Sequence, residues 1–240
     1  MTHSIPYGNK QITFHLEHVE RKTLQINVCP DLCVEVKVPK NAELDKVISK
    51  VKKRAKWIAK QQRYFTRFLP LQPPRKFISG ETHRYLGRQC RLKVIEAPER
   101  KVSMTGGYLN IYLPSPENPK EVRKMVTEWY RTHAEAVFAD ILSDCQAVLE
   151  KLHLQEPDVQ IRFMKTRWGS CSKNGRITLN SELIKAPKSC IRYVVIHELC
   201  HLKEHHHSKK FYMLLEKFCS DWKEQKEKLS QMADVSSHLK

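Results

Sequence analysis

The pattern of apolar and polar residues predicts strands at the start of the chain. Over roughly the first 40 residues the two kinds alternate, as is typical of half-buried strands, in the segments 11–16, 24–28 and 32–39. Apolar residues then recur every three or four positions behind Asn41, which predicts a helix from that N-cap to about residue 66. Alternation returns in 84–87, 90–95, 101–104 and 108–113, and Gly106-Gly107 indicates a two-residue hairpin loop between the last two.

Helical periodicity dominates the second half. Asn118, Pro119 and Glu121 combine an N-cap, a proline at the first helical position and an acid at the third, so a helix of about 30 residues is expected to follow. Two short strands at 159–163 and 176–180 and two more helices, around 188–204 and from about 208, complete the chain. The expected fold is α+β. A strand-rich N-terminal domain with one basic helix covers 1–117, and a mainly helical domain with a short sheet covers 118–240.

Composition narrows the class of protein. None of the apolar runs in the 240 residues approaches the roughly 18–20 residues that span a bilayer, and the chain does not open on a basic segment followed by an apolar stretch. We therefore expect a cytoplasmic protein with no membrane partner. The 8 cysteines are expected to be reduced and mostly buried. Cys29 and Cys33 could form half of a zinc site, but no second pair lies at finger-like spacing.

Positive charge gathers in one part of the chain. The formal net charge is +17, and residues 51–100 hold 14 Lys+Arg against 3 Asp+Glu. Four basic residues of the predicted helix could neutralise the phosphates of a nucleic acid: Lys52, Lys53, Arg54 and Lys56. The same residues could instead form a solvated basic face, and a steep fall in DNA affinity with salt would separate the two interpretations.

The segment His197-Glu198-Leu199-Cys200-His201 carries the strongest chemical signal. Residues four apart lie on one face of a helix, so His197 and His201 can converge on one zinc ion. Glu198 then projects beside the metal, where it can take a proton from a zinc-bound water as a general base. The flanking residues are apolar, and the burial of two histidines and a glutamate without a purpose would be costly.

A catalytic zinc ion needs a third protein ligand. His205 continues the helical series but lies about 12 Å from His197 along a regular helix, which one ion cannot bridge. His207 can return to the metal after the helix has turned, if Ser208 caps the next helix, and is the first candidate. Glu216, further along that next helix, is the alternative. His205 and His206 are expected beside the site or in solvent.

Three residues are candidates for binding substrate. Trp168 is a large anchor that can pack over the site, next to a glycine that permits a tight backbone path. Asn180 ends the predicted strand 176–180, whose edge could hold an extended peptide by backbone hydrogen bonds; a hairpin that only packs on the helix is the alternative. Tyr193 is a candidate for stabilising an oxyanion, together with Tyr212, Arg167 and the remaining histidines.

Several segments in combination resemble the YgjP-like, SprT-related zinc metallopeptidases. They are Arg-Trp-Gly-Ser-Cys-Ser at 167–172, the Ile-x-Leu-Asn that ends at Asn180, the stretch 193–202 around His197, and His-Ser-Lys-Lys-Phe at 207–211. The resemblance implies a zincin-like C-terminal domain. It also implies that His197, His201 and His207 hold zinc and that Glu198 is the catalytic base.

The expected function is therefore a zinc-dependent hydrolase, a metallopeptidase acting on a peptide or protein. Two alternatives stay open. The basic first half would attract a nucleoside triphosphate, and the protein would then be a metal-dependent pyrophosphohydrolase, although the sequence has no glycine-rich phosphate loop. A DNA-associated protease, or a module that only binds nucleic acid, would use the basic residues of 51–100.

Overall fold

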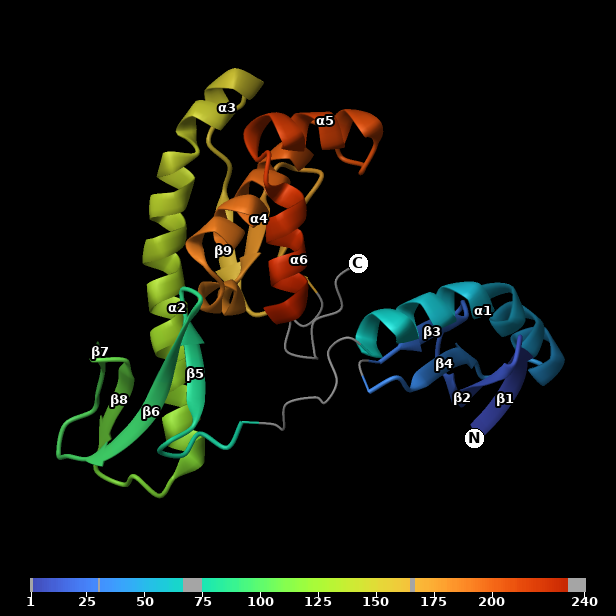
Figure 1. Cartoon of the computed structure of the whole chain (residues 1–240), viewed down its shortest axis with the longest axis horizontal. Coiled ribbons are helices and arrows are strands. Elements are labelled where there is room, and N and C mark those ends of the chain that lie inside the picture. The colour runs from blue at the N-terminus through green and yellow to red at the C-terminus, as the bar shows by residue number, and fades with distance from the viewer. Residues whose placement is uncertain (1, 30, 67–74, 165–166, 233–240) are drawn as a thin grey trace. The chain divides into compact units, whose positions relative to one another are not determined.

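The chain is an α+β protein built from two compact units. The computed structural model describes residues 2–29, 31–66, 75–164 and 167–232 (Figure 1). The first unit is Met1–Pro73 and the second is Pro74–Lys240. Within the described residues, six α-helices accompany three small sheets. None of these helices combines the length and the apolar character needed to cross a membrane.

The first unit is a four-stranded sheet with one helix. Its strands are β1 (Thr2–Tyr7), β2 (Lys10–Val19), β3 (Gln25–Val28) and β4 (Val34–Pro39), in the order β1-β2-β4-β3. The helix α1 (Leu44–Thr66) buries Val47, Val51, Ala55 and Ile58, which join the apolar residues of the sheet in one core. These four apolar residues recur at helical spacing, so they form one face of α1. The burial of this face holds α1 on the sheet.

Two local predictions for this unit are corrected. The helix begins at Leu44 and not behind Asn41, because a turn closed by Ala42 N donating to Pro39 O at 3.1 Å comes first. Strand β1 is absent from the prediction because only Ile5 in it is buried, so its sequence shows no alternation. Antiparallel pairing with β2, which places Ile5 opposite Ile12, holds β1 in the sheet.

The second unit begins with a sheet in the order β5-β6-β8-β7. Its strands are β5 (Thr82–Tyr85), β6 (Arg88–Glu96), β7 (Lys101–Thr105) and β8 (Tyr108–Leu113). The hairpin between β7 and β8 pairs Thr105 with Tyr108 and turns through Gly106 and Gly107, whose φ angles are 59° and 81°. Two successive positive φ angles require glycine, so the predicted hairpin loop is confirmed.

A long helix runs along the second unit. Asn118 caps α2 (Pro119–Asp144) by accepting from the N–H groups of Lys120 and Glu121, as the sequence predicts. The expected single helix of about 30 residues is interrupted at Cys145, and α3 (Gln146–Leu152) follows as a separate helix. Figure 1 shows the first sheet of this unit beside one half of α2, and α4 (Lys188–His201) with β9 (Val159–Arg162) beside the other half.

The last elements surround α4. A three-stranded sheet has the order β10-β11-β9, where β10 is Gly169–Cys171 and β11 is Ile177–Asn180. A short 3-10 helix, η1 (Ser181–Lys185), joins β11 to α4. After α4 come α5 (Lys209–Phe218) and α6 (Trp222–Met232), where the sequence predicted one helix from about 208. The helix ends at Phe218 because Cys219, with φ −149° and ψ 78°, is extended.

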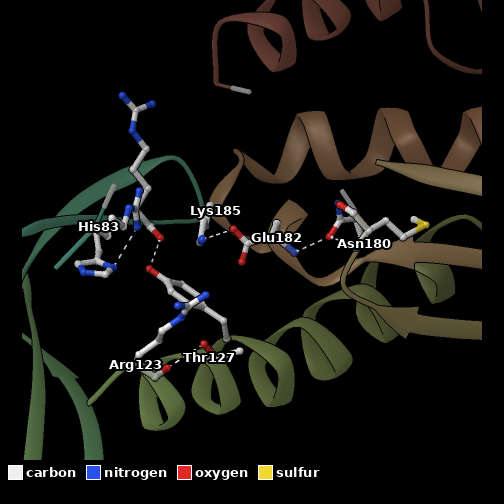
Figure 2. A network of polar contacts seen from close by, with 10 residues as sticks. His83, Arg123, Thr127, Asn180, Glu182 and Lys185 are labelled. Carbon is white, nitrogen blue, oxygen red and sulfur yellow. Dashed lines mark hydrogen bonds and ion pairs between the residues drawn. The ribbon is translucent and has the colours of Figure 1, made fainter. Parts of the chain in front are cut away.

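The division between the units differs from the predicted boundary at 117/118. The turn between β5 and β6 is bonded to η1, since Leu86 N donates to Ile184 O at 2.9 Å and Gly87 N donates to Lys185 O at 3.0 Å. Tyr130 of α2 donates to Arg84 O at 2.7 Å, and Lys185 pairs with Glu182. Figure 2 shows the Lys185–Glu182 pair between His83 and Asn180. The sheet β5–β8 therefore belongs with the helical part, and residues 114–118 are only the connection into α2.

His83 makes the stability of this unit depend on pH. Its side chain is fully buried, with Nδ1 3.1 Å from Arg75 Nη1 and Nε2 3.2 Å from Glu81 Oε2. Burial and the charge of Arg75 lower the pKa of His83 to about 4. In the unfolded chain the pKa is about 6.5, so below that pH the unfolded state binds more protons than the folded state.

We therefore expect the free energy of unfolding to fall as the pH drops from 6.5 toward 4, by at most about 1.4 kcal/mol per pH unit from this histidine. Thermal melts of the whole protein at several pH values measure the slope. The slope should be shallower in His83→Gln than in the native protein. Equal slopes would mean that His83 is already protonated in the folded state.

Candidate metal centre

Two histidines project from one face of α4. His197 and His201 lie one turn apart near the end of the helix, and their ring centroids are 4.9 Å apart. The rest of α4 is mostly buried, including Val194, Val195 and Ile196. Because apolar packing fixes this helix on its neighbours, the two imidazoles have little freedom to move away from each other.

The chain brings a third histidine to the same point after α4 ends. Ser208 caps α5 by accepting from Phe211 N at 3.3 Å, so the segment that carries His207 is held between two helices. His207 Nε2 lies 3.1 Å from His197 Nε2 and 3.2 Å from His201 Nε2. The convergence that the sequence predicted for His207 is therefore present in the structure.

The three nitrogens fit a divalent metal ion. A tetrahedral ion with bonds of about 2.0–2.1 Å separates its ligand nitrogens by about 3.3 Å, close to the separations of 3.1 and 3.2 Å in the structure. Burial and the two neighbouring histidines lower the pKa of His197 to about 3, so its ring is neutral. His201 Nδ1 lies 3.0 Å from Glu204 O, an acceptor that keeps a proton on Nδ1 and leaves Nε2 free to bind a metal.

Phe211 supports all three imidazoles, a role that the sequence analysis missed. Its side chain is fully buried, and its ring centroid lies 4.5 Å from that of His201, 4.9 Å from His197 and 4.8 Å from His207. The ring is stacked on His201 and perpendicular to the other two. The motif His-Ser-Lys-Lys-Phe contains this residue, and its spacing of three from the Ser208 cap is the signal that could have identified it.

Glu198 is a buried carboxylate beside the three histidines. Glu198 is only 5% exposed, and its Oε2 has no hydrogen-bond partner among the described residues. Burial raises the pKa of Glu198 to about 8, and Arg167 opposes the shift. A buried, unpaired carboxylate oxygen is costly, and a cation held by the adjacent imidazoles would favour its charged form.

Gly169 provides the space that Glu198 occupies. A Cβ at position 169 would lie 2.6 Å from Glu198 Oε1 and 2.8 Å from its Cγ, closer than real Cβ atoms come to other heavy atoms. The glycine of the Arg-Trp-Gly-Ser motif is therefore needed for contact between β10 and α4. The sequence alone predicts a backbone role for Gly169 and no relation to Glu198, which lies 29 positions later.

We expect Gly169→Ala to displace the carboxylate and to lower the rate of hydrolysis by about 10–100-fold, since displacements of about 1 Å have effects of that size. Metal content should stay unchanged, because the three atoms nearest to a Cβ at position 169 all belong to Glu198 and none to an imidazole. The control is a double-mutant cycle, which compares the rate constants of Gly169→Ala, Glu198→Gln and the variant with both substitutions. If the glycine acts through Glu198, the alanine will have little effect in the glutamine background; independent effects would contradict this role.

The site lies in a cleft of about 800 Å³. Two of the three predicted substrate-binding residues line it: Trp168, which is 9% exposed, and Tyr193, whose ring lies 5.8 Å from that of His197. A cleft of this volume is typical of small-ligand or peptide sites. Trp168 and Tyr193 therefore remain candidates for contact with substrate.

Asn180 has a different place from the one predicted. It is 1% exposed, and its amide donates to Met164 O at 2.7 Å and to Arg167 O at 2.9 Å. It also caps η1 by accepting from Glu182 N. These hydrogen bonds use the polar atoms of the Asn180 side chain to hold the segment before β10. We therefore no longer expect Asn180 to bind substrate.

The edge strand that lines the cleft is β10 and not the strand that ends at Asn180. In the order β10-β11-β9, β11 is the central strand, and all four of its residues are buried. The prediction of an edge at 176–180 is therefore wrong, because the three-residue strand β10, which the pattern of the sequence does not predict, pairs with β11 on that side. Gly169, Ser170 and Cys171 of β10 all line the cleft.

The alternative ligands do not join the cluster. Glu216 is exposed and accepts a hydrogen bond from Trp222 Nε1. His205 and His206 are exposed at the cleft, as expected. Cys171 lies nearby, and burial, with a smaller effect from Glu198, raises the pKa of its thiol, which favours the uncharged form.

The first unit contains a second group of possible ligands and the predicted nucleic-acid residues. Ligand atoms of Cys29, Asp31 and Cys33 lie within 4.8 Å of one another, and all eight cysteines are free. The four predicted nucleic-acid residues are all exposed on α1: Lys52, Lys53, Arg54 and Lys56. Neither group belongs to the unit that carries the three histidines.

One family model matches most of the chain, and two solved structures resemble part of it. Residues 22–232 match the family model described as YgjP-like, metallopeptidase domain. The metallopeptidase zymogen of Pyrococcus abyssi abylysin is 29% identical over 42% of this chain and 98% of its own, with a TM-score of 0.36. The metallopeptidase zymogen of Methanocaldococcus jannaschii jannalysin is 24% identical over 40% of this chain and 95% of its own, with a TM-score of 0.35. No curated protein gives a significant match.

Proposed function

The chain belongs to the YgjP-like metallopeptidase family, and on that premise we propose that it is a zinc-dependent peptidase with a zincin-like catalytic domain. The observation that carries the proposal is the placement of an unpaired, buried carboxylate, Glu198, in the same cleft as three converging imidazole nitrogens. His197, His201 and His207 would hold the metal. Three histidines without a thiolate or a second carboxylate are typical of catalytic zinc.

In the proposed hydrolysis, each residue of the site has a separate role. His197, His201 and His207 would hold the zinc, which would supply a Lewis acid for the peptide carbonyl and lower the pKa of a water molecule. Glu198 would take a proton from the attacking water and pass it to the departing amine. Burial raises the pKa of this carboxyl, and the positive charge of the metal would favour the charged form that accepts the proton. Gly169 holds the carboxylate in place, and the carbonyl of Glu204 orients His201.

An extended peptide fits the edge of β10. Gly169–Cys171 is an edge strand that lines the cleft next to Glu198, so its outer backbone groups are available to pair with a substrate strand. Pairing there would place the scissile bond near the carboxylate. Trp168 and Tyr193 line the same cleft and would contact the side chains or the polarised carbonyl of the peptide.

A phosphate-containing substrate is the second candidate. Arg167, Lys173 and Lys226 line the cleft, and Glu198 is the one carboxylate among the described residues that line it. This excess of positive charge would attract anions, including a nucleoside triphosphate or an acidic peptide.

One panel of substrates separates the two candidates. The full-length protein loaded with zinc is incubated with a mixed peptide library and, separately, with the nucleoside triphosphates, and new peptide termini and released pyrophosphate are measured. We expect peptide cleavage by the native protein and none by Glu198→Gln. Release of pyrophosphate without peptide cleavage would replace the peptidase proposal with the nucleotide one.

A further inference from the structure

The first unit contains a groove that plays no part in the proposed peptidase. Its volume is about 760 Å³. It is lined by a face of α1 and by the connection between β2 and β3, around Lys22. Its apolar lining includes Leu24, Ile26 and Val38. Every lining residue lies in the range 22–57, so the groove is complete within this unit.

One face of α1 supplies the charged wall. Lys50, Lys53, Arg54 and Trp57 follow one another at spacings that keep them on one side of a helix. Lys52 and Lys56 are on the same helix but do not line the groove, because they are rotated by about 100° or more from that side. The structure therefore divides the four predicted nucleic-acid residues into two that face the groove and two that do not.

The charge of the groove is not neutralised by the protein. Within the described residues, Lys22, Lys50, Lys53 and Arg54 take part in no ion pair, whereas Lys46 pairs with Glu43 at 3.1 Å. Glu43 is the one acidic residue that lines the groove. Four unpaired cations around a concave surface attract a ligand with several negative charges.

An exposed aromatic ring adds a second kind of contact. Trp57 is 39% exposed, lines the same groove as the apolar residues and lies one turn from Lys53 and Arg54. A flat indole beside cations provides stacking for a base and charge for the phosphates that flank it. A groove of this volume holds a few unpaired nucleotides and is too small to enclose a duplex.

We propose that this groove binds single-stranded nucleic acid, with a base stacked on Trp57 and the phosphates contacted by Lys22, Lys50, Lys53 and Arg54. The site is independent of the metal centre. The expected ligand is a chain of phosphates that carries unpaired bases. DNA and RNA share that chemistry.

The test compares two charge reversals on one helix. Binding of labelled 15-mers of deoxythymidine and of uridine to the full-length protein is followed by fluorescence anisotropy at several salt concentrations. Lys53→Glu/Arg54→Glu should weaken binding at least tenfold and lower the steepness of the salt dependence by about 1 to 2 in the logarithmic slope. Lys52→Glu/Lys56→Glu makes the same change of charge on the other side of α1 and should weaken binding much less.

The stacking contact has its own control. Trp57→Ala should weaken binding about tenfold or more, whereas Trp57→Phe, which keeps an aromatic ring, should retain most of the affinity. A difference between the two oligonucleotides shows which of the two the groove prefers, and either preference supports the proposal.

Three results would overturn the proposal: no binding of either oligonucleotide, equal losses in the two double variants, or binding of poly-glutamate as tight as that of the oligonucleotides and unchanged in Trp57→Ala. Equal losses would identify a general basic face. Preference for poly-glutamate would identify an acidic peptide as the ligand. Thermal melts of each variant show whether it is folded, and all the substituted residues are exposed.

Discussion

Replacement of Glu198 by glutamine should lower the rate of peptide hydrolysis by about 10³-fold or more while the protein keeps its metal. The amide has the shape of the carboxylate but cannot accept a proton from water, and general-base catalysis contributes about 10²–10⁴-fold in enzymes. Oε2 of Glu198 is buried without a partner, so an amide at this position breaks no hydrogen bond of the described structure. Single-turnover rates and metal content measured on one preparation check the prediction.

The matching control for Glu198→Gln is Glu216→Gln. Glu216 is the other carboxylate that the sequence suggests for this site, but it is exposed on α5 and bonded to Trp222. Its substitution should leave the rate within a few-fold of the native value. A Glu198→Gln protein that hydrolyses peptides at the native rate, or one that has lost its metal, would contradict the role of Glu198 as a base.

Replacement of His207 by alanine should remove both the metal and the activity. Two histidines of α4 would remain, and a pair of ligands holds a metal much more weakly than three. The loss of affinity should exceed the 10–100-fold that follows removal of a residue that only orients a ligand. Titration with a chromophoric zinc chelator measures the affinity.

His206→Ala is the neighbouring control for His207→Ala. His206 is exposed at the cleft but is not one of the three histidines that converge. The affinity of this variant for zinc should match that of the native protein. Equal losses in the two variants would show that the segment 205–207 matters only for folding or for the general charge of the cleft.

Local signals predicted the centre of the site because its parts are close in sequence. His197 and His201 are fixed by the period of one helix, and His207 follows because Ser208 caps the next helix. Each of these signals lies within a dozen residues. The same holds for the Gly106-Gly107 hairpin and for the Asn118 cap of α2.

Features that depend on distant contacts were not predicted. The edge position of β10 follows from the order of three strands, one of which is only three residues long. The extent of the second unit depends on bonds from Leu86 and Gly87 to η1, which lies almost 100 residues later. The relation between Gly169 and Glu198 likewise joins two elements that the sequence places far apart.

In the proposed peptidase, three histidines of the second unit hold one zinc ion. Elemental analysis combined with zinc X-ray absorption spectroscopy on the full-length native protein tests it most directly. We expect one zinc per chain with nitrogen and oxygen neighbours only, since His197, His201 and His207 offer no sulfur. The three histidines would not be the zinc site if a protein purified without chelators contained no metal. The same would follow from a single zinc with sulfur neighbours, which Cys29 and Cys33 would provide.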